Sequence, residues 1–313
     1  MESAIWGIDL GGTKIEGIVL SGMATDKVLV RKRIATEAHR GYRHVVSRVV
    51  DLVELMKSEI GLKPSVIGFG TPGILDPQTQ RMKNSNTTVL NGEPLKADLT
   101  EALGVPVILA NDANCFALAE THLGVVRQSM EALPRTVFGV IMGTGVGGGI
   151  VVEGKVLNGR HGIAGEWGHN FLDKSGGPCY CGRTGCVETI LSGPGLQRYY
   201  AQLSGEQRPL KEIIERHHRQ PDDFTGQTMD RLIHFFGLAL SVVVNILDPD
   251  VIVLGGGVGN VGELYTEGYR KLCEYTFHGN PRVQVVKPSL GDSAGVFGAA
   301  ALAVPDKSIS PWI

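Results

Sequence analysis

Three cysteines and a histidine stand close together in the middle of the chain. Cys179, Cys181 and Cys186 follow the spacing C-x-C-x4-C, and a histidine, His169, lies ten residues before the first of them. Three thiolates and one imidazole complete a tetrahedral zinc site and leave no position for a reactive water. The spacing therefore predicts a structural Zn²⁺. His161 is a rival ligand, and three free buried cysteines are the alternative.

Two glycine-rich turns could each hold phosphate groups. Residues 9–14 read DLGGTK, and residues 143–149 read GTGVGGG. Glycine has no Cβ, so phosphate oxygens can reach the backbone N–H groups. Thr13 adds a hydroxyl, Lys14 adds a positive charge, and Asp9 could hold a water bound to Mg²⁺. An ordinary glycine hairpin is the alternative for the first turn.

A third glycine run, residues 255–257, follows a predicted strand. Bare backbone there would let a flat adenine ring approach closely. A tight turn from strand to helix is the simpler interpretation of this run alone.

One carboxylate stands where a strand is expected to end and a helix to begin. Asp112 lies in the segment 111–114, with sequence NDAN. Helix capping explains such residues without any function. The carboxyl tip of a strand is also where ligands bind in α/β sheets, and the helix dipole keeps a carboxylate ionised there. Asp112 is therefore a candidate base that accepts a hydroxyl proton during phosphoryl transfer.

Alternating strands and helices are expected to position these residues. The first half predicts a hairpin of strands 5–10 and 15–20, strands 28–34, 65–69 and 105–110, and helices 41–60 and 113–123. The second half predicts strands 136–142, 149–152, 251–254 and 283–286 and helices 229–247, 261–273 and 293–304. This alternation favours α/β layering. The repeated order predicts two halves with a cleft between them.

Composition narrows the class of protein. The 313 residues are 42% hydrophobic and suggest about two domains. The 43 glycines are about twice the usual share. A net charge of -2 gives no reason to expect a nucleic-acid partner.

The N-terminal sequence, the apolar segments and the cysteine content together favour a cytoplasmic location. The N-terminus lacks the pattern of a signal peptide, and the apolar segment 232–247 is too short and too polar for a membrane span. Five cysteines, an odd number, make a poor disulfide framework. We therefore expect a reducing, cytoplasmic setting without a membrane.

These segments together resemble the ROK family of bacterial sugar kinases and repressors. The resemblance covers essentially the whole chain and is carried by residues 9–14, 143–149, 165–169, 179–188 and 255–258. It implies an α/β, two-domain actin-like ATPase fold, of the hexokinase and ribonuclease H-like type, with a zinc-binding insert. A smaller domain would span residues 1–112, with a closing helix at about 294–313 packed back on it. A larger domain, residues 113–293, would carry the zinc-binding insert.

The resemblance also implies roles for matching residues. Asp112 matches the catalytic base that takes the proton of the sugar 6-hydroxyl. Positions that match sugar-binding residues are Gly70, Asn86, Asn111, Asp112, Glu166, His169 and Glu188. Positions that match nucleotide-binding residues are Asp9, Gly11, Gly12, Thr13, Lys14, Gly143, Thr144, Gly145, Gly256 and Gly257. The zinc ligands would be His169, Cys179, Cys181 and Cys186, so His169 would serve metal and sugar. Solvated surface charge is the alternative for Glu166 and Glu188.

The implied activity is ATP-dependent phosphorylation of a hexose at its 6-hydroxyl, with ATP, Mg²⁺ and a structural Zn²⁺. Residues 83–86 (KNSN), the pair Asn91 and Gly92, and the segments ANDANC and NILDPDVIVLGGG look most like bacterial fructokinase/mannokinase. Relatives often carry a tryptophan before the Asn–Gly pair, where this chain has Val89 and Leu90.

Glucose and N-acetylhexosamines remain open as alternative substrates. A sugar-sensing repressor needs a DNA-binding domain before the first glycine hairpin, where eight residues precede Asp9. That alternative is therefore disfavoured. A homodimer is a family expectation only.

Overall fold

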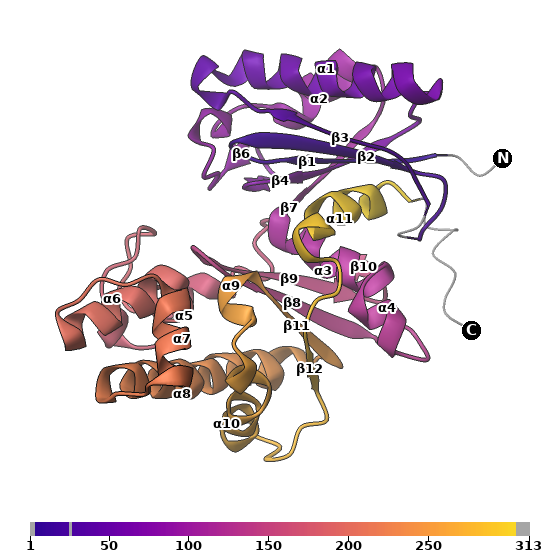
Figure 1. Cartoon of the computed structure of the whole chain (residues 1–313). Coiled ribbons are helices and arrows are strands. Elements are labelled where there is room, and N and C mark those ends of the chain that lie inside the picture. Colours follow the sequence, from indigo (N-terminus) through magenta and orange to yellow (C-terminus); the bar gives the residue numbers. More distant parts are fainter. Residues whose placement is uncertain (1–3, 25–26, 305–313) are drawn as a thin grey trace. The chain divides into compact units, whose positions relative to one another are not determined.

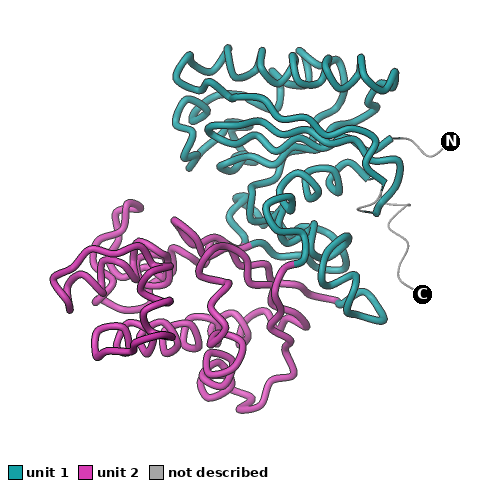
Figure 2. The backbone as a smooth tube through the Cα atoms, viewed as in Figure 1, with its two compact units in different colours: residues 1–134, 149–164, 289–313 teal, residues 135–148, 165–288 magenta. Residues whose placement is uncertain are grey.

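The computed structural model describes residues 4–24 and 27–304 of the chain. It divides into two compact units (Figures 1 and 2). Unit 1 comprises residues 1–134, 149–164 and 289–313, and unit 2 comprises residues 135–148 and 165–288.

Unit 1 is built on a five-stranded sheet in the order β3-β2-β1-β4-β7. Its strands are β1 (Ile5–Leu10), β2 (Lys14–Leu20), β3 (Val28–Ala35), β4 (Ile67–Thr71) and β7 (Val107–Asn111), with the small hairpin β5 (Ile74–Leu75) and β6 (Met82–Lys83) and the short β10 (Lys155–Val156). Its helices are η1 (Ala38–Arg40), α1 (Tyr42–Ile60), η2 (Thr88–Leu90), α2 (Leu95–Leu103), α3 (Asp112–His122), α4 (Val125–Ser129), η6 (Gly291–Ser293) and α11 (Ala294–Leu302). β1 pairs antiparallel with β2 and parallel with β4.

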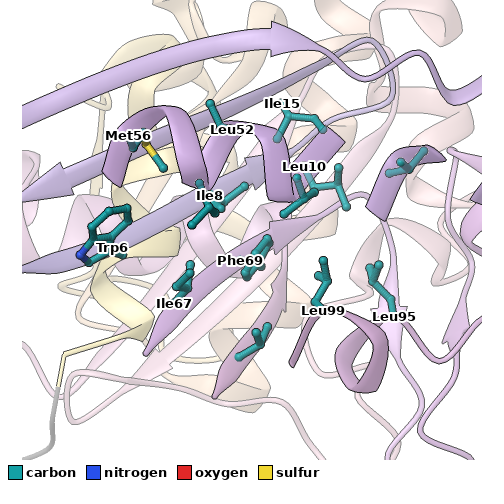
Figure 3. Close-up of a cluster of buried hydrophobic side chains, with 14 of the residues drawn as sticks. Trp6, Ile8, Leu10, Ile15, Leu52, Met56, Ile67, Phe69, Leu95 and Leu99 are labelled. Atoms are coloured by element: carbon teal, nitrogen blue, oxygen red, sulfur yellow. The ribbon is translucent and has the colours of Figure 1, made fainter. Parts of the chain in front are cut away.

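One face of this sheet is covered by α1 and α2. The buried stripe of α1 recurs at helical spacing (Val45, Val49, Leu52, Val53 and Met56). It packs on inward side chains of β1, β2 and β4, and Leu95 and Leu99 of α2 complete the core (Figure 3). A stripe this wide, buried on one side only, is what fixes α1 to the sheet.

The other face is covered by α11 and α3, which pack against each other. Two glycines in the strands let α11 approach closely. A β-carbon on Gly7 would lie 2.3 Å from the backbone N of Ala300, and one on Gly68 would lie 1.9 Å from the carbonyl O of Ala299. This close contact joins the C-terminal helix to the first strand of the chain (Figure 1).

Unit 2 contains most of a second sheet, whose order is β10-β9-β8-β11-β12. The strands are β8 (Thr136–Met142), β9 (Val146–Val152), β11 (Val251–Gly255) and β12 (Gln284–Val286), and β9 passes into unit 1 at residue 149. The helices are η3 (Trp167–His169), η4 (Lys174–Gly176), α5 (Val187–Leu191), α6 (Gly193–Ser204), α7 (Leu210–Arg219), α8 (Asp223–Leu247), α9 (Gly256–Gly259), η5 (Gly262–Tyr265) and α10 (Glu267–Tyr275). β11 lies parallel to both β8 and β12.

The structure differs from the sequence prediction at several boundaries. The glycine turn predicted at 143–149 spans only 143–145, because β9 begins at Val146. The helix predicted at 261–273 is broken into η5 and α10. The compact units also do not divide after residue 112: α3 and α4 stay in unit 1, where α3 packs on α11.

Helix α11 occupies Ala294–Leu302, at the start of the predicted closing helix. It packs on β1 and β4 of unit 1. Residues 305–313 of the predicted closing helix lie outside the described residues.

Helix α8 is long and apolar enough, by length and composition alone, to cross a bilayer. In the described part of the chain it is the one such helix, with a mean hydropathy of 1.6 in its most apolar window. It packs against α6, α7 and α10 within unit 2, and much of that window is buried. Core helices of water-soluble proteins show the same properties.

Candidate active site

The predicted metal ligands come together in unit 2. The ligand atoms of His169, Cys179, Cys181 and Cys186 all lie within 4.8 Å of one another, and His161 is not part of this cluster. Sγ of Cys181 lies 3.6 Å from Sγ of Cys186, and Sγ of Cys179 lies 3.7 Å from Nδ1 of His169. A disulfide would need about 2.0 Å. Ligands on a tetrahedral zinc, at about 2.3 Å each, stand ~3.7 Å apart, so the donor set fits zinc.

Short backbone contacts fold the chain around this cluster. Isolated bridges join Phe171 to Cys186 and Pro178 to Thr184, and the N–H of Gly182 donates to the carbonyl of Cys179. Burial raises the pKa of the Cys186 thiol to about 12. Buried thiols at this spacing ionise together when a cation neutralises them, which again suits a metal ion.

The two ring nitrogens of His169 face different partners. Nδ1 faces Cys179, and Nε2 lies 3.0 Å from the hydroxyl of Tyr180. A metal on Nδ1 places the ring proton on Nε2, so that nitrogen can donate a hydrogen bond. The predicted double role of His169 needs this arrangement.

Glu188 holds the turn at 143–145. Its Oε2 accepts a hydrogen bond of 3.0 Å from the N–H of Val146, and a β-carbon on Gly145 would lie 2.5 Å from the same oxygen. The N–H of Gly193 donates to the carbonyl of Gly143 at 2.8 Å. Glu188 is therefore not a solvated surface charge, and a side chain at position 145 would displace its carboxylate. Glu166, the other acid beside the cluster, stands at the N-cap position of η3, but its side chain makes no capping hydrogen bond there.

The 9–14 hairpin of unit 1 is braced from outside. Gly11 N–H donates to the Lys14 carbonyl at 3.0 Å and closes the turn. Thr36, which is fully buried, donates its hydroxyl to the Gly11 carbonyl at 2.7 Å and its N–H to the Thr13 carbonyl at 3.0 Å. Gly12, Thr13 and Lys14 are exposed. Sequence reasoning missed Thr36, which carries no local signal because it follows a different strand.

Asp9 lies at the end of β1 between two glycines. A β-carbon on Gly295 would be 2.8 Å from Oδ2 of Asp9, and one on Gly70 would be 3.3 Å from Oδ1. Burial, reinforced by the charges of Asp112 and Glu16, raises the pKa of Asp9 to about 6. A carboxylate crowded by other carboxylates is a site for a cation, and Mg²⁺ prefers oxygen ligands of this kind.

Asp112 is the first residue of α3, directly after β7. Asn111 is the N-cap, because its Oδ1 accepts from the N–H of Asn114 at 2.8 Å. Capping therefore falls to Asn111, while Oδ1 of Asp112 accepts from the N–H of Ala113 at 2.8 Å. Burial raises the pKa of Asp112, although the residue as a whole is solvent-accessible. An accessible carboxylate with a raised pKa is suited to accept a proton.

Glu16 is a buried carboxylate that sequence reasoning missed. It stands opposite Asp9 in the β1–β2 register and is 3% exposed. Burial acts to raise its pKa, but hydrogen bonds from Arg33 and Arg31 outweigh that effect and lower it. Glu16 is therefore ionised and adds negative potential beside Asp9. The hairpin pattern itself could have revealed this pairing.

The 84–91 loop carries Asn86, which is exposed. Asn91 clamps the loop: its Oδ1 accepts from the N–H of Ser85 at 2.9 Å, and its Nδ2 donates to the Ser85 carbonyl at 3.0 Å. The N–H of Asn86 donates to the carbonyl of Pro72 at 3.2 Å, which ties this loop to the segment after Gly70. Asn91 thus acts as a brace, a role that its position in the sequence did not reveal.

The two glycines predicted to approach adenosine differ. Gly256 has φ +80°, and a β-carbon there would lie 2.2 Å from the carbonyl O of Met142. Gly257 has nothing within 4 Å of such a position. Gly256 is therefore required by the tight turn itself, and open space lies at Gly257. A separate cavity of about 800 Å³ runs along α6, lined by Pro194, Arg198 and neighbours, and contains none of the predicted residues.

Each unit gathers its own share of the predicted residues. Unit 1 holds Asp9, Gly11, Gly12, Thr13, Lys14, Gly70, Asn86, Asn111 and Asp112. Unit 2 holds Gly143, Thr144, Gly145, Glu166, His169, Cys179, Cys181, Cys186, Glu188, Gly256 and Gly257. That both sets meet around one hexose and one nucleotide stays a prediction.

Comparisons with known proteins identify the family of the chain. The family model described as "ROK family" matches residues 5–305. An N-acetyl-D-glucosamine kinase of Pectobacterium carotovorum is 34% identical over 311 residues, covering 96% of this chain and 99% of the relative. The structure of a ROK hexokinase from Thermus thermophilus matches with a TM-score of 0.82 at 31% identity, covering 96% of this chain and 97% of the other.

A third match has its ligands bound. A ROK family glucokinase from Streptomyces griseus, in complex with glucose and AMPPNP, matches with a TM-score of 0.74 at 28% identity, covering 96% of this chain and 99% of the other. The site geometry, the match over nearly the whole chain and the shared fold lead to one conclusion. The chain belongs to the ROK family and has its actin-like, hexokinase-type fold.

Proposed function

We propose that this protein is an ATP-dependent kinase that transfers a phosphoryl group to the 6-hydroxyl of a hexose. The observation that carries the proposal is the pair of carboxylates Asp9 and Asp112 beside the braced 9–14 hairpin of unit 1. Phosphoryl transfer needs a cradle for phosphates, a carboxylate for the metal ion and a base for the hydroxyl. Unit 1 supplies one candidate for each.

Each residue has a proposed task. Exposed backbone N–H groups of the 9–14 hairpin and the 143–145 turn would hold phosphates, and Lys14 would add a positive charge. Asp9 would hold Mg²⁺, which supplies charge neutralisation on the phosphate oxygens. Asp112 would take the proton of the attacking hydroxyl. Asn86, Asn111, Glu166, His169 and Glu188 would orient the sugar, with Gly70 beneath it.

We further propose that His169, Cys179, Cys181 and Cys186 hold a structural Zn²⁺. Four protein ligands leave no position for substrate on such an ion. Its contribution would be to fix the ring of His169 and the start of α5, which carries Glu188.

N-acetyl-D-glucosamine is the first candidate substrate, because it names the kinases that match this chain at 33–36% identity. Fructose or mannose is the second candidate. It is supported by the resemblance of residues 83–86 and of Asn91–Gly92 to fructokinase/mannokinase, and Asn91 braces the loop that carries Asn86. We place the reaction in the cytoplasm, where ATP is available, and the homodimer stays an expectation.

A coupled assay of ADP release tests the proposal. The purified protein is supplied with ATP, Mg²⁺ and, in separate reactions, N-acetylglucosamine, N-acetylmannosamine, fructose, mannose and glucose. We expect release of ADP that depends on one of these sugars, with N-acetylglucosamine tested first. No release with any hexose would overturn the kinase proposal, and preference for fructose or mannose would select the second candidate.

A further inference from the structure

Thr87 lies where two parts of the candidate site touch. It directly follows Asn86 in the 84–91 loop and is 8% exposed. A β-carbon on Gly12, in the 9–14 hairpin, would lie 2.9 Å from Oγ1 of Thr87. The predicted sugar-side loop and the predicted phosphate-side hairpin are therefore in direct contact within unit 1.

The loop side of this contact is stiff. The hydroxyl of Ser85 donates to the carbonyl of Thr87 at 3.1 Å and accepts from the N–H of Thr87 at 3.1 Å. Asn91 holds Ser85 through two further hydrogen bonds. Because these bonds enclose Asn86, a displacement of Asn86 moves Thr87 with it.

On the hairpin side of the contact, Thr36 holds the backbone by hydrogen bonds and Thr87 lies against Gly12. Thr36 fixes the carbonyls of Gly11 and Thr13. Thr87 meets Gly12 between them, with no room for an added methyl group. A shift of Thr87 toward the hairpin would therefore displace Gly12.

We propose that Thr87 is a positioning residue that couples the two substrates. A hexose on Asn86 fixes the 84–91 loop, Thr87 then fixes the tip of the hairpin, and nucleotide phosphates bind more tightly. The proposal rests on the proposed function, because it requires the loop to bind sugar and the hairpin to bind phosphate. Coupling of this kind is reciprocal, so nucleotide must tighten sugar by the same factor.

Calorimetry measures the coupling directly. The Kd of AMPPNP with Mg²⁺ is measured without and with a saturating hexose that the protein phosphorylates, and the ratio of the two is the coupling factor. We expect a factor of at least about 5 in the wild type, the lower end of the usual range. Thr87→Ala should lower it at least about threefold, and Thr87→Ser, which keeps the hydroxyl, should retain it.

Thr88→Ala is the matched control. Thr88 is the next residue and is exposed, so its substitution should leave the coupling factor unchanged. An unchanged factor in Thr87→Ala, or a wild-type factor of one, would overturn the proposal. These two results are distinguishable from failure of the proposed function, because in that case the protein would phosphorylate no hexose at all.

A double-mutant cycle of Gly12→Ala and Thr87→Ala tests the same contact by a second measurement. Gly12→Ala should raise the KM for sugar as well as for ATP, because its methyl group pushes Thr87 and the loop. In a Thr87→Ala background the added methyl group finds space, so the effect of Gly12→Ala on the sugar KM should shrink toward none. Equal effects of Gly12→Ala on the sugar KM in both backgrounds would contradict the contact as the route of coupling.

Discussion

Asp9 and Asp112 have like charge and belong to the same region of unit 1, yet their surroundings differ. Asp9 is wedged between Gly70 and Gly295, whereas Asp112 is accessible at the tip of a strand. Burial raises the pKa of both carboxyl groups, and the charge of Asp112 raises the pKa of Asp9 further. This difference in access is the reason that we assign the metal to Asp9 and the proton to Asp112.

Replacing Asp112 by Asn should separate binding from turnover. Asn keeps the oxygen that accepts from the N–H of Ala113 but cannot take a proton. We expect kcat to fall by at least about 100-fold, the usual contribution of a general base, while the Kd for the hexose stays within about threefold. Steady-state kinetics and calorimetry measure the two quantities. Asp230→Asn, an exposed carboxylate on α8, is the control, and near-normal turnover in Asp112→Asn would remove it as the base.

Replacing Asp9 by Asn should stabilise the folded protein in a manner that depends on pH. The folded-state pKa of about 6 lies above the ordinary value of 3.8, so the folded state favours the protonated form. The unfolding free energy of the wild type therefore falls as pH rises from 3.8 to about 6, by about 3 kcal/mol at most from this group. We expect Asp9→Asn to raise Tm over the wild type more at pH 8 than at pH 4.5, while activity is lost. An equal gain at both values would contradict the shifted pKa.

Elements, rather than single residues, bring the site of unit 1 together. Asp9 is the penultimate residue of β1, Asn111 is the last residue of β7, and α11 packs on both strands. Glu120, near the end of α3, is fully buried and accepts from the N–H groups of Val125, Ser289 and Leu290. It thereby sets the register between α3, which begins at Asp112, and the start of α11.

Loss of charge at Glu120 should therefore loosen this register. Glu120→Gln replaces one carboxylate oxygen by an amide group that cannot accept the N–H bonds. We expect the unfolding free energy to fall by about 3 kcal/mol, as for a buried hydrogen bond to a charged group, and kcat to fall with it. Thermal melting and kinetics check both effects. Glu101→Gln, on the exposed side of α2, is the control; equal melting of the two variants would contradict the role of Glu120.

Strong periodicity made some elements predictable, and weak periodicity hid others. The β1–β2 hairpin and α1 follow from alternating and helical apolar patterns. α2 was missed because its nine residues bury only Leu95 and Leu99. Gly148 and Gly149 were assigned to a phosphate turn, but they lie in β9, where an added Cβ would meet Trp167 and the Ala113 carbonyl. A sequence cannot show such contacts, since the partners lie far away along the chain.

At the scale of the whole molecule, the candidate residues are distributed over two compact units. Motifs with fixed spacing, such as C-x-C-x4-C, were recoverable from the sequence, and the structure brings their ligands within 4.8 Å. Bracing residues such as Thr36 and Asn91 were not recoverable, because their partners are recognised only after the chain has folded.

Removing the proposed zinc should affect folding and activity together. Structural zinc contributes directly to folding free energy, so a chelator or Cys181→Ser should lower Tm by at least about 5 °C and reduce activity in parallel. Elemental analysis should find one zinc per chain in the wild type and less in Cys181→Ser. Cys273→Ser, outside the cluster, is the control. A metal-free wild type with unchanged melting after chelation would contradict a structural zinc.

The central claim is transfer of phosphate from ATP to the 6-hydroxyl of a hexose, and the position of phosphate in the product tests it most directly. The wild type is incubated with ATP, Mg²⁺ and the accepted hexose, and the product is identified by ³¹P and ¹³C nuclear magnetic resonance. The account predicts equal amounts of ADP and hexose 6-phosphate, formed at least about 100-fold more slowly by Asp112→Asn. Phosphate on another hydroxyl, or ATP hydrolysis without a phosphorylated sugar, would contradict it.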